Sequence, residues 1–258
     1  MSRGEIDLIW TVLQDGTTGI FTYMPEQQVY AWSRMTTPNG KMTSVACVEN
    51  QSDDDYIYFT VQRDGKYYVE FLSPRRDDFM EEFIYLDHAL WYYDATTKHT
   101  IFQNATFYAG KKTTVFADGN VYENVQVDAN GEFSLPVACN YAVIGIPYIS
   151  TAETLELFDG SESRSTVSTY RNTTAIIVNL LNSRSLQVGQ EYDTLTDYNF
   201  NLEHREDWSV PPQLFTGRIE LALEAARSGN GGRVIMQNKY PVPLTVNSLI
   251  AKMNVGDG

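Results

Sequence analysis

Cysteine is scarce in this sequence. The 258 residues contain two, Cys47 and Cys139, and neither belongs to a Cys-x-x-Cys pair with histidines nearby. A disulfide framework needs several cysteines, and a structural zinc site needs clustered cysteine and histidine ligands, so neither class fits this chain. Two free, buried thiols are favoured over a single disulfide between them.

Long apolar runs and positive charge are also lacking. No stretch of about 18 apolar residues occurs, so no membrane-spanning helix is predicted, and residues 1–7 lack the apolar region of a signal peptide, as expected of an unexported protein. Lys and Arg number 19 against 33 Asp and Glu, which gives a net charge of −14. Gripping nucleic acid by its phosphates requires clustered cations, so the charge argues against that class. The same negative charge is compatible with a protein whose acidic wall lets DNA slide past.

Common catalytic signatures are missing. The sequence has no P-loop, no dinucleotide Gly-x-Gly-x-x-Gly, no Gly-x-Ser-x-Gly elbow and no His-Glu-x-x-His. The histidines, His88, His99 and His204, are scattered, whereas a metal site needs converging ligands. His88 follows Asp87, but neighbours in a strand point to opposite faces, so this pair is expected to diverge. No catalytic residue, metal site or cofactor is predicted.

Two further clusters have a functional and a structural interpretation. Asp53-Asp54-Asp55 offers carboxylates to calcium but lacks the glycine that bends a calcium loop, so a solvated turn is favoured. Trp91-Tyr92-Tyr93 suits a sugar platform, although aromatics in an all-β chain more often fill its core. With 33 acidic residues, some carboxylate pair at a glycosidase-like distance is expected in any fold.

Short alternating segments separated by turn residues dominate the chain. It is 43% hydrophobic and 13% aromatic, with 17 tyrosines, which suits half-buried strands. In 56–61, Ile57, Phe59 and Val61 are expected on one face of a strand. Three turns are each expected to close a hairpin: Asp15-Gly16, Pro38-Asn39-Gly40 and Asp64-Gly65. These features predict an all-β fold of antiparallel sheets.

The stretch 108–157 contains three short strands and two tight turns. Asp118-Gly119 and Asn130-Gly131 tolerate the positive φ that a two-residue hairpin needs, so a β-meander is predicted. Its last strand runs through 143–148.

The C-terminal hundred or so residues contain two further strand pairs. Segment 174–180 alternates apolar residues, and Asn182-Ser183 is expected to turn it into 186–188, before Gly189. Segments 219–223 and 234–237 flank the glycine-rich 229–232, which suggests a hairpin loop. Pro241 and Pro243 lack a backbone donor and suit the start or the edge position of a last strand, 244–250.

Several motifs follow one another in a recognisable order. They are 4–10, 29–36, 41–46, 56–63 with 68–72, 86–94, 110–119, 143–148 with Thr154-Leu155, 178–183 with 186–189, 214–217, and Gln237 with 241–246. In this order, the chain resembles the later part of the tail nozzle proteins of short-tailed phages, also called head-to-tail stabilisation proteins. It departs from them at 104–109, which lacks the Gly-Leu-x-His-Leu-like run found there, and at Asp94, which no glycine follows.

The resemblance implies a structural virion protein. Such proteins form a hexameric tube below the portal and adaptor rings, through which DNA passes without sequence-specific binding, and they retain the packaged genome. It further implies synthesis in the host cytoplasm and a place in the phage tail. Because the family's proteins are usually longer, the chain is expected to be a C-terminal portion. On its own it is expected to stay monomeric, since cyclic contacts need both faces of the subunit.

The expected architecture has three parts, with polar breaks at 73–78 and 159–165. They are a partial propeller-like antiparallel sheet over 1–86, a small β-barrel over 87–157 and a β-sandwich-like domain over 158–258. Segment 79–93 is favoured as extended, and 192–212 is interpreted as a long loop.

The motif positions are expected to have structural roles in turns, and none is assigned to DNA. They are Asp118, Gly119, Asn130, Gly131, Gly145, Pro147, Tyr148, Asn182, Ser183, Gly189, Thr216, Gly217, Pro241 and Pro243. Two other functions stay open. A carbohydrate-binding module or phage adhesin would present an exposed aromatic cluster, and a glycoside hydrolase would need two carboxylates roughly 5 to 9.5 Å apart in a cleft.

Overall fold

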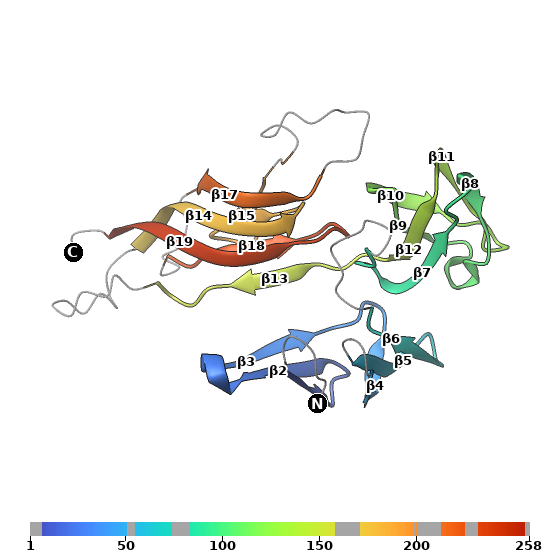
Figure 1. Cartoon of the computed structure of the whole chain (residues 1–258), viewed down its shortest axis with the longest axis horizontal. Helices are drawn as coiled ribbons and strands as arrows, with labels where there is room; N and C mark the ends of the chain where they lie inside the picture. Colours follow the sequence, from blue (N-terminus) through green and yellow to red (C-terminus); the bar gives the residue numbers. More distant parts are fainter. Residues whose placement is uncertain are drawn as a thin grey trace. The chain divides into compact units, whose positions relative to one another are not determined.

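The computed structural model describes residues 7–50, 55–73, 83–157, 171–198, 200, 213–224 and 232–255. The described chain is all-β and consists of several antiparallel sheets, as predicted (Figure 1). It divides into two compact units. Unit 1 comprises 1–76 and 86–90, and unit 2 comprises 77–85 and 91–258.

Unit 1 contains two three-stranded sheets. The first consists of β1 (Leu8–Val12), β2 (Thr18–Met24) and β3 (Val29–Met35), and a 3-10 turn, Pro25–Gln27, joins its last two strands. The second consists of β4 (Lys41–Val48), β5 (Tyr56–Arg63) and β6 (Lys66–Phe71). Each sheet has one strand fewer than the four of a propeller blade.

Two of the three predicted hairpins in unit 1 are confirmed. Asp15-Gly16 lies in the turn between β1 and β2, and Asp64-Gly65 joins β5 to β6 with φ of 48° and 76°, the twist that suits a two-residue hairpin. The third, at 38–40, is wrong. There β3 pairs with β2 while β4 pairs with β5, so the turn carries the chain from one sheet to the next.

The core of unit 1 explains this crossing. The strand alternation predicted for β5 is confirmed, because Ile57, Phe59 and Val61 are buried. Met35, before the turn, and Met42, after it, belong to the same core cluster. A turn signal sets a change of direction, but burial of both apolar faces decides which strands pair. The first sheet also contributes Trp10, whose ring meets that of Phe59 edge-on at 5.9 Å.

The first part of unit 2 contains two open sheets around one core. The strands are β7 (Asp87–Tyr93), whose residues up to Leu90 belong to unit 1, β8 (His99–Phe102), β9 (Lys112–Ala117), β10 (Asn120–Gln126), β11 (Phe133–Cys139) and β12 (Tyr141–Ile146). Four of them form a sheet in the order β10-β9-β12-β7, and β11 pairs with β8. A 3-10 turn, Thr106–Tyr108, also contributes to the core. Within the described residues neither sheet closes, so the predicted small barrel is corrected to two open sheets.

The turn at Asn130-Gly131 causes this separation. Asp118-Gly119 closes the predicted two-residue hairpin between β9 and β10, with φ of 41° and 85°. After Asn130-Gly131, however, β11 pairs with β8 and not with β10, so the predicted meander is wrong. The Asp128 carboxylate accepts the N–H groups of Asn130 and Glu132 and caps a wider turn than a hairpin has.

The C-terminal part of unit 2 consists of two sheets that share one core, and one of them includes β13, which precedes the predicted domain 158–258 (Figure 1). One sheet has the order β13-β18-β15-β16, from β13 (Ser150–Glu153), β18 (Ile235–Asn238), β15 (Gln187–Gly189) and β16 (Thr196–Asp197). The other has the order β17-β14-β19, from β17 (Phe215–Ala222), β14 (Arg171–Ser183) and β19 (Thr245–Val255). Buried side chains of both layers, such as Ile176, Val188 and Ile219, form one core.

Several C-terminal predictions are corrected by the strand pairing. β14 continues through Asn182-Ser183, which form a bulge and not a turn, and β15 belongs to the other sheet. β17 and β18 also lie in different sheets, so they do not form a hairpin. The last strand is confirmed: β19 starts after Pro243 and lies at a sheet edge.

Parts of other predictions fall outside the described residues. These are Asp53, Asp54, residues 79–82, His204, most of 192–212 and most of 229–232. Within 79–93, the described strand β7 is extended, as favoured.

Candidate functional site

The predicted Asp118-Gly119 turn makes contacts at both of its residues. The Asp118 carboxylate accepts the backbone N–H groups of Asn140 at 3.0 Å and Tyr141 at 2.9 Å, which fixes the start of β12 beside β9. The Gly119 carbonyl accepts a hydrogen bond from Arg184 Nη1 at 2.5 Å. Because Arg184 follows β14, this bond joins the hairpin to the C-terminal sandwich.

Directly before Arg184, the Asn182-Ser183 bulge of β14 is hydrogen-bonded to the neighbouring strands β17 and β19. Asn182 has a φ of 44°, and its N–H donates to Thr216 Oγ1 on β17 at 2.9 Å. The Ser183 hydroxyl accepts the N–H of Thr245 on β19 at 2.9 Å. A bulge leaves backbone groups outside the regular ladder, and here side chains bind them.

Arg184 connects these groups and was not singled out from the sequence. Its N–H donates to the Pro243 carbonyl at 2.9 Å, while its guanidinium reaches the Gly119 carbonyl. The Arg184 junction, as we name it, comprises Asp118, Gly119, Asn182, Ser183, Arg184, Thr216 and Pro243. An arginine directly after a bulge is a weak sequence signal, since only the fold shows what lies within its reach.

The other predicted motif positions lie apart from this junction. Gly131 has a φ of 81°, and its carbonyl accepts the N–H of Ala105. The Gly145 carbonyl accepts the Thr113 hydroxyl. Gly189 pairs with Ile235. The remaining ones are Asn130, in the Asp128 turn; Pro147 and Tyr148, between β12 and β13; Gly217, opposite Leu180; and Pro241, before β19.

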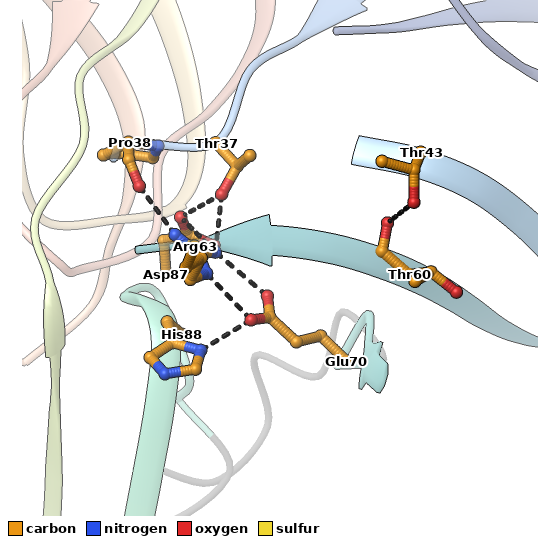
Figure 2. A network of polar contacts seen from close by, with 8 residues as sticks. All are labelled: Thr37, Pro38, Thr43, Thr60, Arg63, Glu70, Asp87 and His88. Atoms are coloured by element: carbon orange, nitrogen blue, oxygen red, sulfur yellow. Dashed lines mark hydrogen bonds and ion pairs between the residues drawn. The ribbon is translucent and has the colours of Figure 1, made fainter. Parts of the chain in front are cut away.

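A second polar cluster lies in unit 1, around the buried side chain of Arg63 (Figure 2). Its Nε and Nη2 donate to the two oxygens of Glu70 at 2.9 and 3.0 Å, and Nη2 also lies 3.1 Å from Asp87 Oδ2. Nη2 and Nη1 each donate at 2.6 Å, to Thr37 Oγ1 and the Pro38 carbonyl. One guanidinium thus holds the turn between the two sheets, the β5–β6 hairpin and the start of β7.

His88 joins this cluster, contrary to the prediction that it and Asp87 diverge. His88 Nδ1 lies 2.5 Å from Glu70 Oε1, while Asp87 binds Arg63 and accepts the Thr37 hydroxyl at 2.6 Å (Figure 2). The reason is the backbone: His88 has a φ of 49°, so the alternation of an extended strand fails at this residue.

The electrostatics of the cluster suit a clamp better than a catalyst. Burial alone raises the pKa of Glu70, but hydrogen bonds from His88 and Arg63 outweigh it and lower this pKa from 4.5 to about 2. Burial likewise opposes the charge of Arg63, yet the two carboxylates raise its pKa. A glycosidase acid needs a raised pKa, so Glu70 does not fit that role.

The two cysteines form no cross-link, and Cys139 does not have the character of a nucleophile. Both thiols are free, as predicted; Cys139 is buried and Cys47 is partly buried. Burial, followed by the nearby charge of Asp118, raises the pKa of Cys139 to about 11. Since the thiolate is the reactive form, Cys139 is inert at neutral pH. Among the described residues no three His, Cys, Asp or Glu side chains converge as metal ligands.

Exposed aromatic rings gather on the first sheet of unit 1. The Trp32 ring lies 4.9 Å from Phe21, Phe21 lies 6.4 Å from Tyr23, and Tyr23 lies 5.8 Å from Tyr30. Trp32 and Tyr30 are 66% and 57% exposed. At the predicted platform 91–93, by contrast, the central ring, Tyr92, packs against the core of unit 2.

The chain matches no protein-family model and no curated protein. In the described part of the chain, no helix has the length and hydropathy that a bilayer crossing requires.

Proposed function

We propose that this chain is a structural component of a phage tail, part of a nozzle-type conduit that lies below the portal and adaptor and retains the packaged genome. The observation that supports this most is the Arg184 junction. There, turns from separate stretches of the resemblance bind one another through hydrogen bonds. Hydrogen bonds between parts of the same chain hold these parts together, which is a structural role.

The charge fits a conduit. At −14, the chain has no excess of cations with which to hold DNA phosphates, so DNA can pass without being retained by the wall. No catalytic step is part of the proposal. The full-length protein would act as a homohexamer in the virion, after synthesis in the host cytoplasm.

Electron microscopy tests this proposal directly. The full-length protein is reconstituted with a portal–adaptor complex, and we expect a six-fold ring or tube on the adaptor face. An Arg184→Ala variant is expected to give fewer or less regular rings than an Arg218→Ala variant, because Arg218 lies exposed on β17. Particles that show free monomers beside bare adaptor rings would contradict the proposal.

A carbohydrate-binding module is the second candidate, and the exposed rings around Trp32 favour it. Aromatic faces suit apolar sugar surfaces, and the rings of this sheet form a continuous row. A glycan array separates the candidates: binding that Trp32→Ala abolishes and Trp91→Ala preserves would support a module. Trp91 is a suitable control because it is 52% exposed in unit 2. An array without any binding removes this candidate.

A further inference from the structure

The second sheet of unit 1 exposes an apolar face. Paired residues of β4, β5 and β6 place alternate side chains away from the core of Ile57, Phe59 and Val61. The exposed ones define the Val69 face: Val48, Tyr56, Tyr58, Tyr67, Val69 and Phe71, of which Val69 is 76% and Tyr67 65% exposed. Soluble monomers seldom expose a continuous apolar patch of this kind, and such patches mark interaction sites.

The first sheet exposes a different apolar face. Ile9, Phe21 and Trp32 form one row in register across its three strands, and Tyr23 pairs with Tyr30 beside them. These five residues define the Trp32 face. The opposite side of the same sheet contributes Trp10, Val12 and Met35 to the core of unit 1. The unit thus exposes two unlike apolar faces, one on each of the sheets that share its core.

Charge narrows the choice of partner. The outward positions of the Val69 face are 44, 46 and 48 on β4, 56, 58, 60 and 62 on β5, and 67, 69 and 71 on β6, and none of them is Asp, Glu, Lys or Arg. Lys41 stands at one end of this face. On the side of the sheet that carries the Trp32 face, the charged residues are Asp7, which precedes β1 and lies next to Tyr23, and Arg34, which is paired with Asp15. Neither an anionic nor a cationic partner therefore finds complementary charges at the centre of either face.

A second copy of the chain is a partner that requires no complementary charge at the centre of either face. Two copies that each carry −14 repel one another, and this repulsion is weakest where acidic residues are absent. Any partner for the Trp32 face must itself be apolar and uncharged. The Val69 face has that chemistry and is present on every copy.

We propose that the Trp32 face of one copy packs against the Val69 face of the next. Because the two faces differ, this contact is head-to-tail, and repeated contacts close into a ring or extend as a filament. The inference rests on the proposed function for its biological setting, since it names the subunit contact of the tube. In contrast to the monomer expected from the resemblance, it also implies that the chain as given self-associates, because both faces are present.

Lysine substitutions test each face separately. Tyr30→Lys charges the Trp32 face and Val69→Lys charges the Val69 face. Tyr93→Lys and Val137→Lys are the matched controls, because these residues are each 59% exposed, lie in unit 2 and undergo the same change of charge. A charge buried in an apolar contact is expected to weaken association by about tenfold or more.

Sedimentation velocity over a dilution series measures the outcome. Wild type and both controls are expected to form species larger than dimers, whereas Tyr30→Lys alone and Val69→Lys alone sediment as monomers. An equimolar mixture of these two variants keeps one intact pair of faces, so it is expected to form dimers and nothing larger. Formation of these dimers also shows that both variants are folded.

Three results would overturn the head-to-tail contact. They are a monomeric wild type at the highest concentration reached, equal loss of association in the controls, and a mixture that stays monomeric. Conversely, a chain that associates as described but forms no ring on a portal–adaptor complex would leave the contact standing and refute the conduit.

Discussion

At the scale of single residues, Arg63 stands out because its charged side chain is buried. Its guanidinium is fully buried, and it faces Glu70 and Asp87, which are 20% and 22% exposed. Removing one partner of a buried ion pair leaves a charge without compensation, whereas an exposed pair contributes little. Whether an ion pair is buried or exposed therefore decides how much it contributes to stability. Arg63, which is buried, and Arg34, which is exposed, allow this comparison.

Arg63→Met is expected to lower the free energy of unfolding by about 3 to 5 kcal/mol, because two carboxylates lose their main donor. Arg34→Met, the control, removes an exposed pair with Asp15 and is expected to lower the free energy of unfolding much less. Urea denaturation of both variants measures the difference. Equal losses would mean that the Arg63 cluster does not act as a clamp.

The lowered pKa of Glu70 predicts a dependence of stability on pH. A carboxylate whose pKa is lower in the folded state stabilises the fold above its unfolded pKa and loses this effect as the pH falls towards the folded value. For Glu70 the window runs from 4.5 down to about 2. Glu70→Gln is expected to flatten the pH dependence of the unfolding free energy in this window. Glu123→Gln, at an exposed position on β10, serves as the control and is expected to follow wild type.

At the scale of elements, the turns differ in how closely other backbone approaches them. Gly65 and Gly131 both have positive φ, of 76° and 81°. A Cβ at Gly65 would meet nothing within 4 Å, but one at Gly131 would lie 2.7 Å from the Thr106 nitrogen. The sequence signals are alike at the two sites, and the packing around them differs.

Gly131→Ala is therefore expected to destabilise the protein more than Gly65→Ala. Both substitutions place a Cβ at positive φ, at a cost of about 1 kcal/mol. Gly131→Ala must also displace the backbone at 105–106, which adds roughly 1 to 3 kcal/mol. Thermal unfolding of the two variants gives the difference. Identical melting temperatures would show that the backbone at 105–106 can move away from the added Cβ without a loss of stability.

At the scale of the whole molecule, the Arg184 junction ties the β9–β10 hairpin to the C-terminal sandwich. Arg184→Met is expected to raise amide hydrogen exchange at Tyr141, because the neighbouring Asp118-Gly119 turn loses its support. Exchange in the sandwich core around Ile176 is expected to stay unchanged. Arg218→Met is the control, and a variant that exchanges like it throughout would contradict a joining role for Arg184.

The sequence by itself determined the local structure of this protein. Alternation in 56–61 was sufficient to assign the buried face of β5, and Asp64-Gly65 and Asp118-Gly119 form the predicted hairpins, because positive φ and adjacent strands are local properties. The position of the last strand after Pro243 also followed from local chemistry, since proline lacks an N–H donor.

Tertiary structure decided which strands pair and which polar groups meet. The turns at 38–40 and 130–131 gave correct changes of direction but wrong partners, because pairing depends on burying apolar faces far apart in sequence. The contacts of Arg63, His88 and Arg184 likewise depend on strands brought together by folding and, at His88, on one residue with positive φ. Sequence spacing does not encode such distances, whereas the packed sheets fix them.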